Sequence, residues 1–158
     1  MTQGRTPRDS LTEKTEIVLP QFTNAIGTAF GGTIMSWADI CAAVSAQRHC
    51  GRVAVTASVD AFQFLAPIRL GDVVILRGRV NAVFRTSMEV EVTIEREGFD
   101  ADKRVLCAVS LLTFVNIGED GRPAPIPPLI LENDDDRLRA KQAAARREQR
   151  LAARRNEP

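Results

Sequence analysis

A two-residue period of apolar and polar side chains recurs along this chain, as in β-strands that bury one face. The clearest example is the stretch 88–95, where Met, Val, Val and Ile alternate with Glu and Thr. The stretches 53–65 and 73–84 show the same period, a shorter alternation at 14–19 ends at a proline, and 104–115 is apolar on both faces. A strand that is apolar on both faces is typical of the middle of a sheet. The pattern therefore predicts a five-stranded sheet.

The stretch 33–48 follows a helical period instead, because its apolar residues recur at steps of three and four. Gly51 follows this stretch, and glycine is a common signal for the C-terminal end of a helix. A helix of this length can cover one face of a sheet. The predicted fold is therefore α+β, with one long helix against a five-stranded antiparallel sheet.

The two ends of the chain differ from its middle. Residues 1–13 are polar, and we expect them to form a flexible leader. Residues 14–130 form one predicted domain, since no repeat or linker divides them. Residues 131–158 are rich in Arg, Ala and Gln and have few large apolar side chains to bury. This composition predicts a solvated helix or a partly disordered tail.

Composition and charge limit the classes of function. The formal net charge is +1, and no apolar run approaches the roughly 20 residues that span a bilayer. We therefore expect neither a nucleic-acid partner nor a membrane partner. The N-terminal residues lack the apolar core of a signal peptide, and an odd number of cysteines, three, fits reduced thiols. We therefore expect a cytoplasmic protein.

The chain contains a single histidine, His49. One histidine argues against a His-based metal site and against a Ser-His-Asp triad, and the cysteines lack zinc-ligand spacing. We expect no bound metal ion. Because His49 lies at the end of the helical stretch, we expect it to interact favourably with the C-terminal end of the helix dipole.

The most unusual ionisable residue is Asp39, which lies inside the apolar helical stretch. No other Asp or Glu occurs between Glu16 and Asp60. An acid among apolar side chains is costly to bury unless a partner or a reaction uses its charge. Asn24 precedes it in a glycine-containing loop, and we take the two residues as the candidate reactive centre. In the structural alternative, Asp39 only holds a hydrogen bond across an interface and Asn24 only forms a turn or a cap.

Three motifs occur in the order TNAIGTAFGGTIMSWADICAA, VTASVDAFQFLAPIRLGDVV and RTSMEVEV. Together they resemble acyl-CoA thioesterases of the single-hotdog acyl-CoA hydrolase family, over residues 18–127. The resemblance implies the hotdog fold, in which the sheet wraps around one long central helix. It also implies hydrolysis of an acyl-CoA thioester to a free fatty acid and CoA. CoA is then part of the substrate, and no separate cofactor is implied.

The resemblance further implies an assembly of several copies. Proteins of this family form dimers whose sheets pair edge to edge, and three such dimers commonly form a hexamer. The loop Asn and the helix Asp act together at the dimer interface, one from each protomer. In this sequence those roles fall on Asn24 and Asp39.

Thioester hydrolysis needs a positioned water or nucleophile, and stabilisation of the oxygen that becomes negative. Asp39 could act as the general base for water, or attack the carbonyl itself to form a mixed anhydride. Asn24 would orient the water or hydrogen-bond the carbonyl. Gly31 and Gly32 begin the helix, so their free backbone N–H groups and the helix dipole could polarise the thioester carbonyl. The sequence leaves the base and nucleophile routes open.

Binding of CoA requires cations and hydrogen-bond donors for its phosphates. The family pattern places the turn Arg85, Thr86 and Ser87 near the nucleotide. Arg85 has no evident acidic partner, whereas Arg79 is expected to pair across the strands with Glu91. Candidates for the pantetheine and thioester region are Thr56 and Ser58, and the acyl tail is expected near Ile34, Met35, Phe62 or Phe64.

The sequence leaves two other functions open. The first is a non-catalytic acyl-CoA sensor that uses the same pocket only for binding. The second is another hotdog enzyme, a hydratase or dehydratase. Those enzymes usually use a histidine together with an acid, and His49 is far along the helix from the loop of Asn24.

Overall fold

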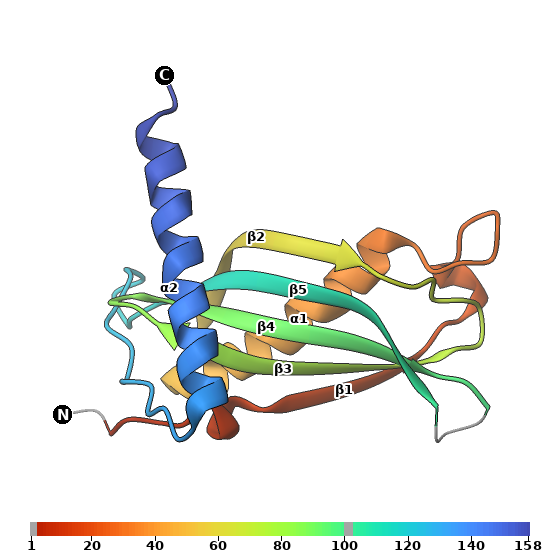
Figure 1. Cartoon of the computed structure of the whole chain (residues 1–158), viewed down its shortest axis with the longest axis horizontal. Coiled ribbons are helices and arrows are strands. Elements are labelled where there is room, and N and C mark those ends of the chain that lie inside the picture. The colour runs from red at the N-terminus through yellow and green to blue at the C-terminus, as the bar shows by residue number, and fades with distance from the viewer. Residues whose placement is uncertain (1–2, 100–102) are drawn as a thin grey trace.

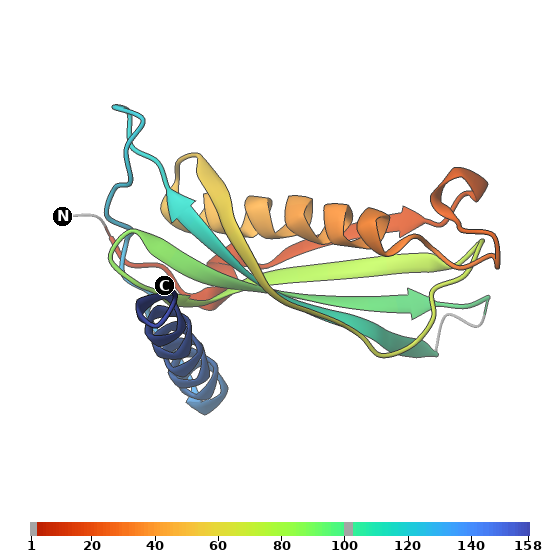
Figure 2. The same ribbon diagram turned by 90° about the horizontal axis from the view of Figure 1, so that it is seen from above.

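Five antiparallel strands form one sheet in the order β1-β3-β4-β5-β2 (Figure 1). The computed structural model describes residues 3–99 and 103–158. The helix α1 (Gly31–Cys50) covers the inner face of this sheet, and α2 (Asp134–Arg155) lies on the opposite, outer face (Figure 2). The strands are β1 (Thr12–Ile17), β2 (Ala54–Phe64), β3 (Val73–Val83), β4 (Ser87–Glu97) and β5 (Arg104–Asn116). The α+β hotdog arrangement expected from the sequence is confirmed, and β1 and β2 are the two edges of the sheet.

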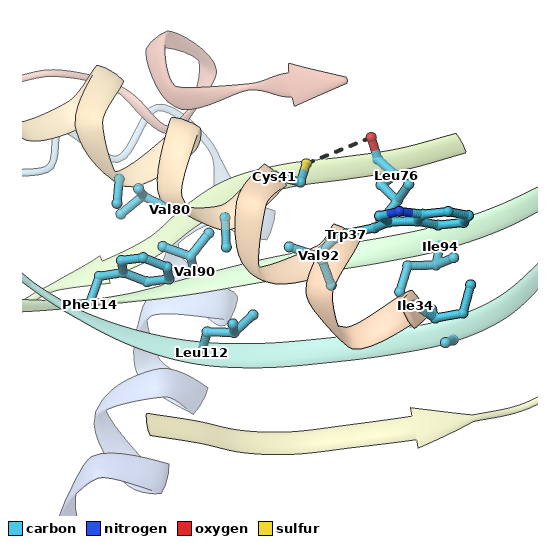
Figure 3. Close-up of a cluster of buried hydrophobic side chains, with 14 of the residues drawn as sticks. Ile34, Trp37, Cys41, Leu76, Val80, Val90, Val92, Ile94, Leu112 and Phe114 are labelled. Carbon is cyan, nitrogen blue, oxygen red and sulfur yellow. Dashed lines mark hydrogen bonds between the residues drawn. The ribbon is translucent and has the colours of Figure 1, made fainter. Parts of the chain in front are cut away.

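Apolar side chains of α1 and of the three central strands form the core (Figure 3). Gly78 in β3 allows close packing, because a Cβ at this position would lie 2.5 Å from Ser45 Oγ on α1. The helix ends before Gly51, as predicted, and the φ of 68° at Gly51 is a left-handed conformation that glycine adopts without strain. The core residues labelled in Figure 3 are Ile34, Trp37, Cys41, Leu76, Val80, Val90, Val92, Ile94, Leu112 and Phe114.

The N-terminal segment is packed where the sequence predicted a flexible leader. A 3-10 turn, η1 (Pro7–Ser10), precedes β1, which begins at Thr12 rather than at residue 14. Ser10 is fully buried, and its hydroxyl accepts a hydrogen bond from Val80 N at 2.9 Å. Residues from Pro7 onwards therefore belong to the packed domain, while residues 1 and 2 of the expected leader lie outside the described part of the chain. A second 3-10 turn, η2 (Pro20–Phe22), follows β1.

The helix α2 occupies the stretch that was expected to be a solvated helix or a partly disordered tail. It crosses the outer face of the sheet (Figure 1) and is attached by ion pairs. Arg146 Nη2 lies 2.6 Å from Glu89 Oε1, and Arg139 Nη1 lies 2.5 Å from Glu91 Oε1. The Glu89 side chain is only 1% exposed beneath this helix. Because α2 attaches mainly through charged side chains, with Ala143 as its one fully buried apolar residue among those described, its composition alone indicated a solvated segment.

The prediction of an ion pair between Arg79 and Glu91 is wrong, although the predicted strand register is correct. The two residues are directly opposite in the pairing of β3 with β4. Arg79 instead donates to Asp136 of α2 at 2.9 Å, and Glu91 binds Arg139 of the same helix. Both side chains therefore pair with α2 and not with each other. No helix in residues 3–99 and 103–158 combines the length and the apolar composition needed to cross a bilayer.

Candidate active site

The structure pairs Asp39 with Thr56. Asp39 is half-buried on α1, and its Oδ1 accepts a hydrogen bond from Thr56 Oγ1 on β2 at 2.6 Å. In the described part of the chain its other oxygen, Oδ2, accepts no hydrogen bond. The contact lies where the helix faces the edge strand, and Thr56 is exposed in the single chain. The carboxylate therefore has one oxygen fixed by the protein and one available to another group.

Several apolar side chains of α1 and β2, the two elements that carry this pair, are exposed in the single chain. On α1, Ile40 is 49% exposed and Met35 is 38% exposed. On β2, Val55 and Val59 are 45% and 43% exposed. Because β2 is also an edge strand with unpaired backbone groups, this side of the molecule has the features of an interface.

Ser58, expected beside Thr56, lies on the other face of the sheet. The pairing of β2 with β5 is irregular between Thr56 and Ser58 and again between Val59 and Ala61. Such β-bulges add a residue to one strand and reverse the alternation of its side chains. Thr56 therefore points to Asp39, whereas the Ser58 hydroxyl donates to Asp60 Oδ1 at 2.7 Å. A strict alternation of side chains along β2 does not predict this reversal. For the same reason it does not predict the contacts of Asp60 with Ser58 and Thr113.

Asn24 closes its own loop. Its Oδ1 accepts hydrogen bonds from the backbone N–H groups of Ile26 and Thr28, both at 3.1 Å, and its Nδ2 donates to Thr28 Oγ1 at 2.6 Å. The loop also contains Gly27, with a φ of +79°. Within one chain no hydrogen bond joins Asn24 to Asp39, which is roughly 12 Å along the helix axis from the start of α1. The turn-forming role considered for Asn24 is thus present, and in the part of the chain that the structure describes its Nδ2 makes one hydrogen bond, which leaves its second amide hydrogen without an acceptor.

Gly31 and Gly32 form the first turn of α1, as predicted. In residues 3–99 and 103–158 their backbone N–H groups have no acceptor, as is normal for the first residues of a helix. A Cβ at Gly31 would contact the Phe64 ring at 3.5 Å, whereas Gly32 faces open space. Next to this helix start lies a mostly apolar hollow of about 350 Å³. Its lining residues are Thr28, Ala29, Ile34, Phe64, Leu65, Ala66, Pro67 and Ile68.

The turn of Arg85, Thr86 and Ser87 lies at the opposite end of the sheet from the Asn24 loop (Figure 1). This turn connects β3 to β4, and its carbonyl groups accept backbone hydrogen bonds. For example, Thr86 O accepts a hydrogen bond from Asn116 N at 3.0 Å. Ser87 is paired with Val115, which is itself paired with Val55 beside Thr56. The turn is therefore two strands away from Thr56, about 10 Å across the sheet. Arg85 is exposed and forms no ion pair with the described residues.

His49 does not have the role expected for it. The ring is fully buried, and Nε2 lies 2.9 Å from the carbonyl oxygen of Pro127. Burial lowers the pKa of His49 below its usual value, so the neutral form of the ring is favoured. A neutral ring does not interact with the helix dipole as a cation would. Within the described residues, no group of three or more His, Cys, Asp or Glu side chains could hold a metal ion.

The three cysteines are free and buried. Burial raises the pKa of Cys41 to about 11, and it also raises the pKa values of Cys50 and Cys107. Cys41 lies in the core against Leu76 (Figure 3), with Sγ 3.8 Å from the Leu76 carbonyl oxygen. A thiol with so high a pKa is protonated at neutral pH and is not a nucleophile.

Comparison with known proteins gives consistent matches. The family model of the thioesterase superfamily matches residues 26–99. An uncharacterized acyl-CoA thioester hydrolase of Bacillus subtilis is 42% identical over 129 residues, which are 82% of this chain and 75% of that protein. The cytosolic acyl coenzyme A thioester hydrolase of Rattus norvegicus is 34% identical over 132 residues, and the chain spans only 35% of its length.

Two solved structures are similar over nearly the whole chain. An acyl-CoA hydrolase from Staphylococcus aureus, in complex with butyryl coenzyme A, coenzyme A and coenzyme A disulfide, has a TM-score of 0.89 and 37% identity. The match covers 95% of this chain and 92% of that one. An apo hexameric acyl-CoA thioesterase has a TM-score of 0.92 and 34% identity, with coverage of 99% and 100%. The Staphylococcus aureus enzyme has also been solved with an Asp, an Asn or a Thr replaced by alanine.

The sheet wrapped around α1 and the similarity to these enzymes lead to one conclusion. This chain belongs to the hotdog-fold acyl-CoA thioesterases of the thioesterase superfamily.

Proposed function

We propose that this chain hydrolyses acyl-CoA thioesters to CoA and a free carboxylic acid, with Asp39 as general base or nucleophile. The observation that carries the proposal is the hydrogen bond from Thr56 to Asp39 Oδ1, which leaves Oδ2 without a partner in the described chain. The bond fixes the orientation of the carboxylate, so that the free oxygen is presented in one direction. Structures of the related Staphylococcus aureus enzyme were solved with an Asp, an Asn or a Thr replaced by alanine, and Asp39, Asn24 and Thr56 are residues of these three types.

In the general-base route, Asp39 accepts a proton from water while the water oxygen attacks the thioester carbonyl carbon. The carbonyl oxygen becomes negative, and the free N–H groups of Gly31 and Gly32 are suited to stabilise it. When the carbonyl re-forms, the C–S bond breaks and the CoA thiolate takes the proton. In the nucleophile route, Asp39 displaces CoA directly, and water then hydrolyses the mixed anhydride. Accumulation of an acyl adduct on Asp39, measured by mass spectrometry during turnover, would distinguish the second route from the first.

We further propose that a second copy completes the site. The exposed edge strand β2, with apolar side chains such as Val55 and Val59, is suited to pair with β2 of another chain. In one chain Asn24 is not joined to Asp39, and its loop projects at the end of the sheet beyond the start of α1 (Figure 1). Asn24 of one protomer would then act beside Asp39 of its partner, using its remaining amide hydrogen. A trimer of such dimers is the proposed assembly, by analogy with hexameric structural neighbours.

The two ends of the substrate would lie in different regions. The hollow of about 350 Å³ beside Gly31, which contains Ile34 and Phe64, is suited to the acyl chain. The exposed guanidinium of Arg85, with Thr86 and Ser87, is suited to the phosphates of CoA. Three buried, unpaired thiols fit a reducing compartment, and we propose that the protein works in the cytoplasm.

The proposal is tested by release of free thiol from acyl-CoAs of several chain lengths. The wild type should release CoA well above the uncatalysed rate, whereas Asp39→Ala and Asn24→Ala should be close to background. Wild-type rates in both variants would overturn the assignment of the site. Tight acyl-CoA binding without turnover would instead favour the sensor, and turnover of enoyl- or hydroxyacyl-thioesters would favour a hydratase.

A further inference from the structure

Asp60 belongs to β2, the strand that also carries Thr56, and its carboxylate is buried on the outer face of the sheet. Its side chain is only 7% exposed. Oδ1 accepts from Ser58 Oγ at 2.7 Å, Oδ2 accepts from Thr113 Oγ1 at 2.6 Å, and Arg150 Nε of α2 lies 3.5 Å from Oδ1. Two hydroxyl donors and a neighbouring guanidinium hold this carboxylate in one place.

These contacts join three separate elements at one point of the edge strand. Ser58 belongs to β2 itself, Thr113 to the neighbouring strand β5, and Arg150 to α2. Glu89 and Glu91 form ion pairs that tie α2 to β4, and among the ion pairs of the described residues Asp60 is the group that ties α2 to β2. The outer-face contacts of β2 are therefore concentrated on Asp60.

The position of Asp60 within the strand relates it directly to Thr56. The pairing of β2 with β5 is irregular on both sides of Ser58, with Ala57 and Asp60 as the extra residues. The first irregularity turns Thr56 to the inner face and Ser58 to the outer face. By holding the Ser58 hydroxyl, Asp60 fixes the direction in which the chain leaves this bulge. A slip of one residue would move Thr56 away from Asp39.

Apart from the pairing of its backbone with Phe114, few contacts restrain Thr56. It is exposed on an edge strand, and its side chain bonds only to Asp39 among the described residues. We infer that Asp60 is a positioning residue of the active site, which acts through Ser58 and the bulge at Ala57 to keep the Thr56 hydroxyl on Asp39. The kinetic part of this inference rests on the proposed function. The geometric part, the distance from Thr56 to Asp39, does not.

A double-mutant cycle tests the inference. Asp60→Asn should lower kcat about tenfold, with KM changed less than about threefold, because misplacement of a catalytic contact mainly costs the chemical step. In a Thr56→Val background the same substitution should lower kcat less than about twofold, since the hydroxyl that it positions is already gone. A purely structural role would give equal factors in the two backgrounds, and that result would overturn the inference.

Two matched controls sharpen the cycle. Glu91→Gln removes another carboxylate that binds α2, but Glu91 lies on β4 and not beside the bulge next to Thr56. This variant should therefore keep kcat within about twofold of wild type. Thr113→Ser keeps the hydroxyl donor to Asp60 and should stay close to wild type, whereas Thr113→Val should lower kcat. If Asp60→Asn does not fold, Thr113→Val takes its place in the cycle with the same criterion.

A crystal structure of Asp60→Asn separates failure of the inference from failure of the proposed function. The inference predicts that Thr56 Oγ1 moves out of hydrogen-bond distance of Asp39 Oδ1, whatever the reaction. An unchanged contact of 2.6 Å would overturn it. If the wild type hydrolyses no acyl-CoA, or if Asp39→Ala is fully active, the proposed function fails and this structural result alone decides the inference.

Discussion

Thr56 Oγ1 lies 2.6 Å from Asp39 Oδ1, and this hydrogen bond joins the edge strand β2 to the middle of α1. It connects the one carboxylate of a mainly apolar helix to a hydroxyl that a β-bulge turns inward. The arrangement gives Asp39 a defined orientation and leaves its Oδ2 without a hydrogen bond among the described residues.

Substitutions at the two partners should have unequal effects on hydrolysis. Asp39→Asn removes the base or nucleophile and should lower kcat at least about 100-fold. Thr56→Val removes only the orienting bond and should lower kcat about tenfold, or about 1.4 kcal/mol of barrier. Thr56→Ser keeps the hydroxyl and serves as the control. Steady-state kinetics on one acyl-CoA measure all three, and an unimpaired Thr56→Val would remove Thr56 from the mechanism.

The attachment of α2 predicts a specific loss of stability. Arg146→Ala leaves the Glu89 carboxylate, 1% exposed, without its cation, and should cost roughly 3 kcal/mol of unfolding free energy. Arg137→Ala removes a cation from the same helix whose partner, Asp134, is 99% exposed, and should cost less than about 0.5 kcal/mol. Urea unfolding at one fixed protein concentration compares the two variants. Equal losses would show that Glu89 does not need its partner.

His49 predicts how stability depends on pH. Burial lowers its pKa in the folded state, so below the ordinary value the unfolded state binds more protons than the folded state. This residue therefore makes the protein less stable as pH falls below about 6.5, the unfolded value. His49→Gln should show a smaller loss of unfolding free energy between about pH 7.5 and 5.5 than the wild type. The slope is the readout, since the substitution can also change stability at every pH, and equal slopes would contradict the prediction.

The buried thiols predict inertness toward thiol reagents. With the pKa of Cys41 raised to about 11 and the other two thiols also buried, the native protein should react with none of its three cysteines at neutral pH. Ellman's reagent should detect three thiols per chain only after unfolding. Rapid reaction of the native protein would show that the core opens readily. Inert thiols also allow the same reagent to follow CoA release.

The alternation of apolar and polar side chains was enough to predict most strands of the sheet, and β4 is the clearest example. Its inward residues, such as Val90 and Val92, are fully buried as expected. The bulges in β2 could not be predicted in this way, because an extra residue reverses the pattern without changing composition. That is why Ser58 was expected beside Thr56 and lies behind it.

The position of α2 was hidden for a different physical reason. Its contacts with Glu89 and Glu91 are ionic, and charged residues on both partners have the sequence pattern of solvated surfaces. Asp39 was identifiable because it is the one acid in a long apolar stretch. Its relation to Asn24 could be inferred only from the family resemblance, since in one chain Asn24 bonds to its own loop.

The most direct test of the composite site is subunit complementation between Asn24→Ala and Asp39→Ala chains. Each variant alone should be inactive, because every site lacks one of the two groups. In a mixed dimer, one site receives intact Asn24 from one chain and intact Asp39 from the other, while the second site lacks both. Co-expression with random pairing should therefore restore about one quarter of the wild-type activity. Activity that stays at the level of the separate variants, with mixed dimers confirmed by mass spectrometry, would show that the two residues do not act across the interface.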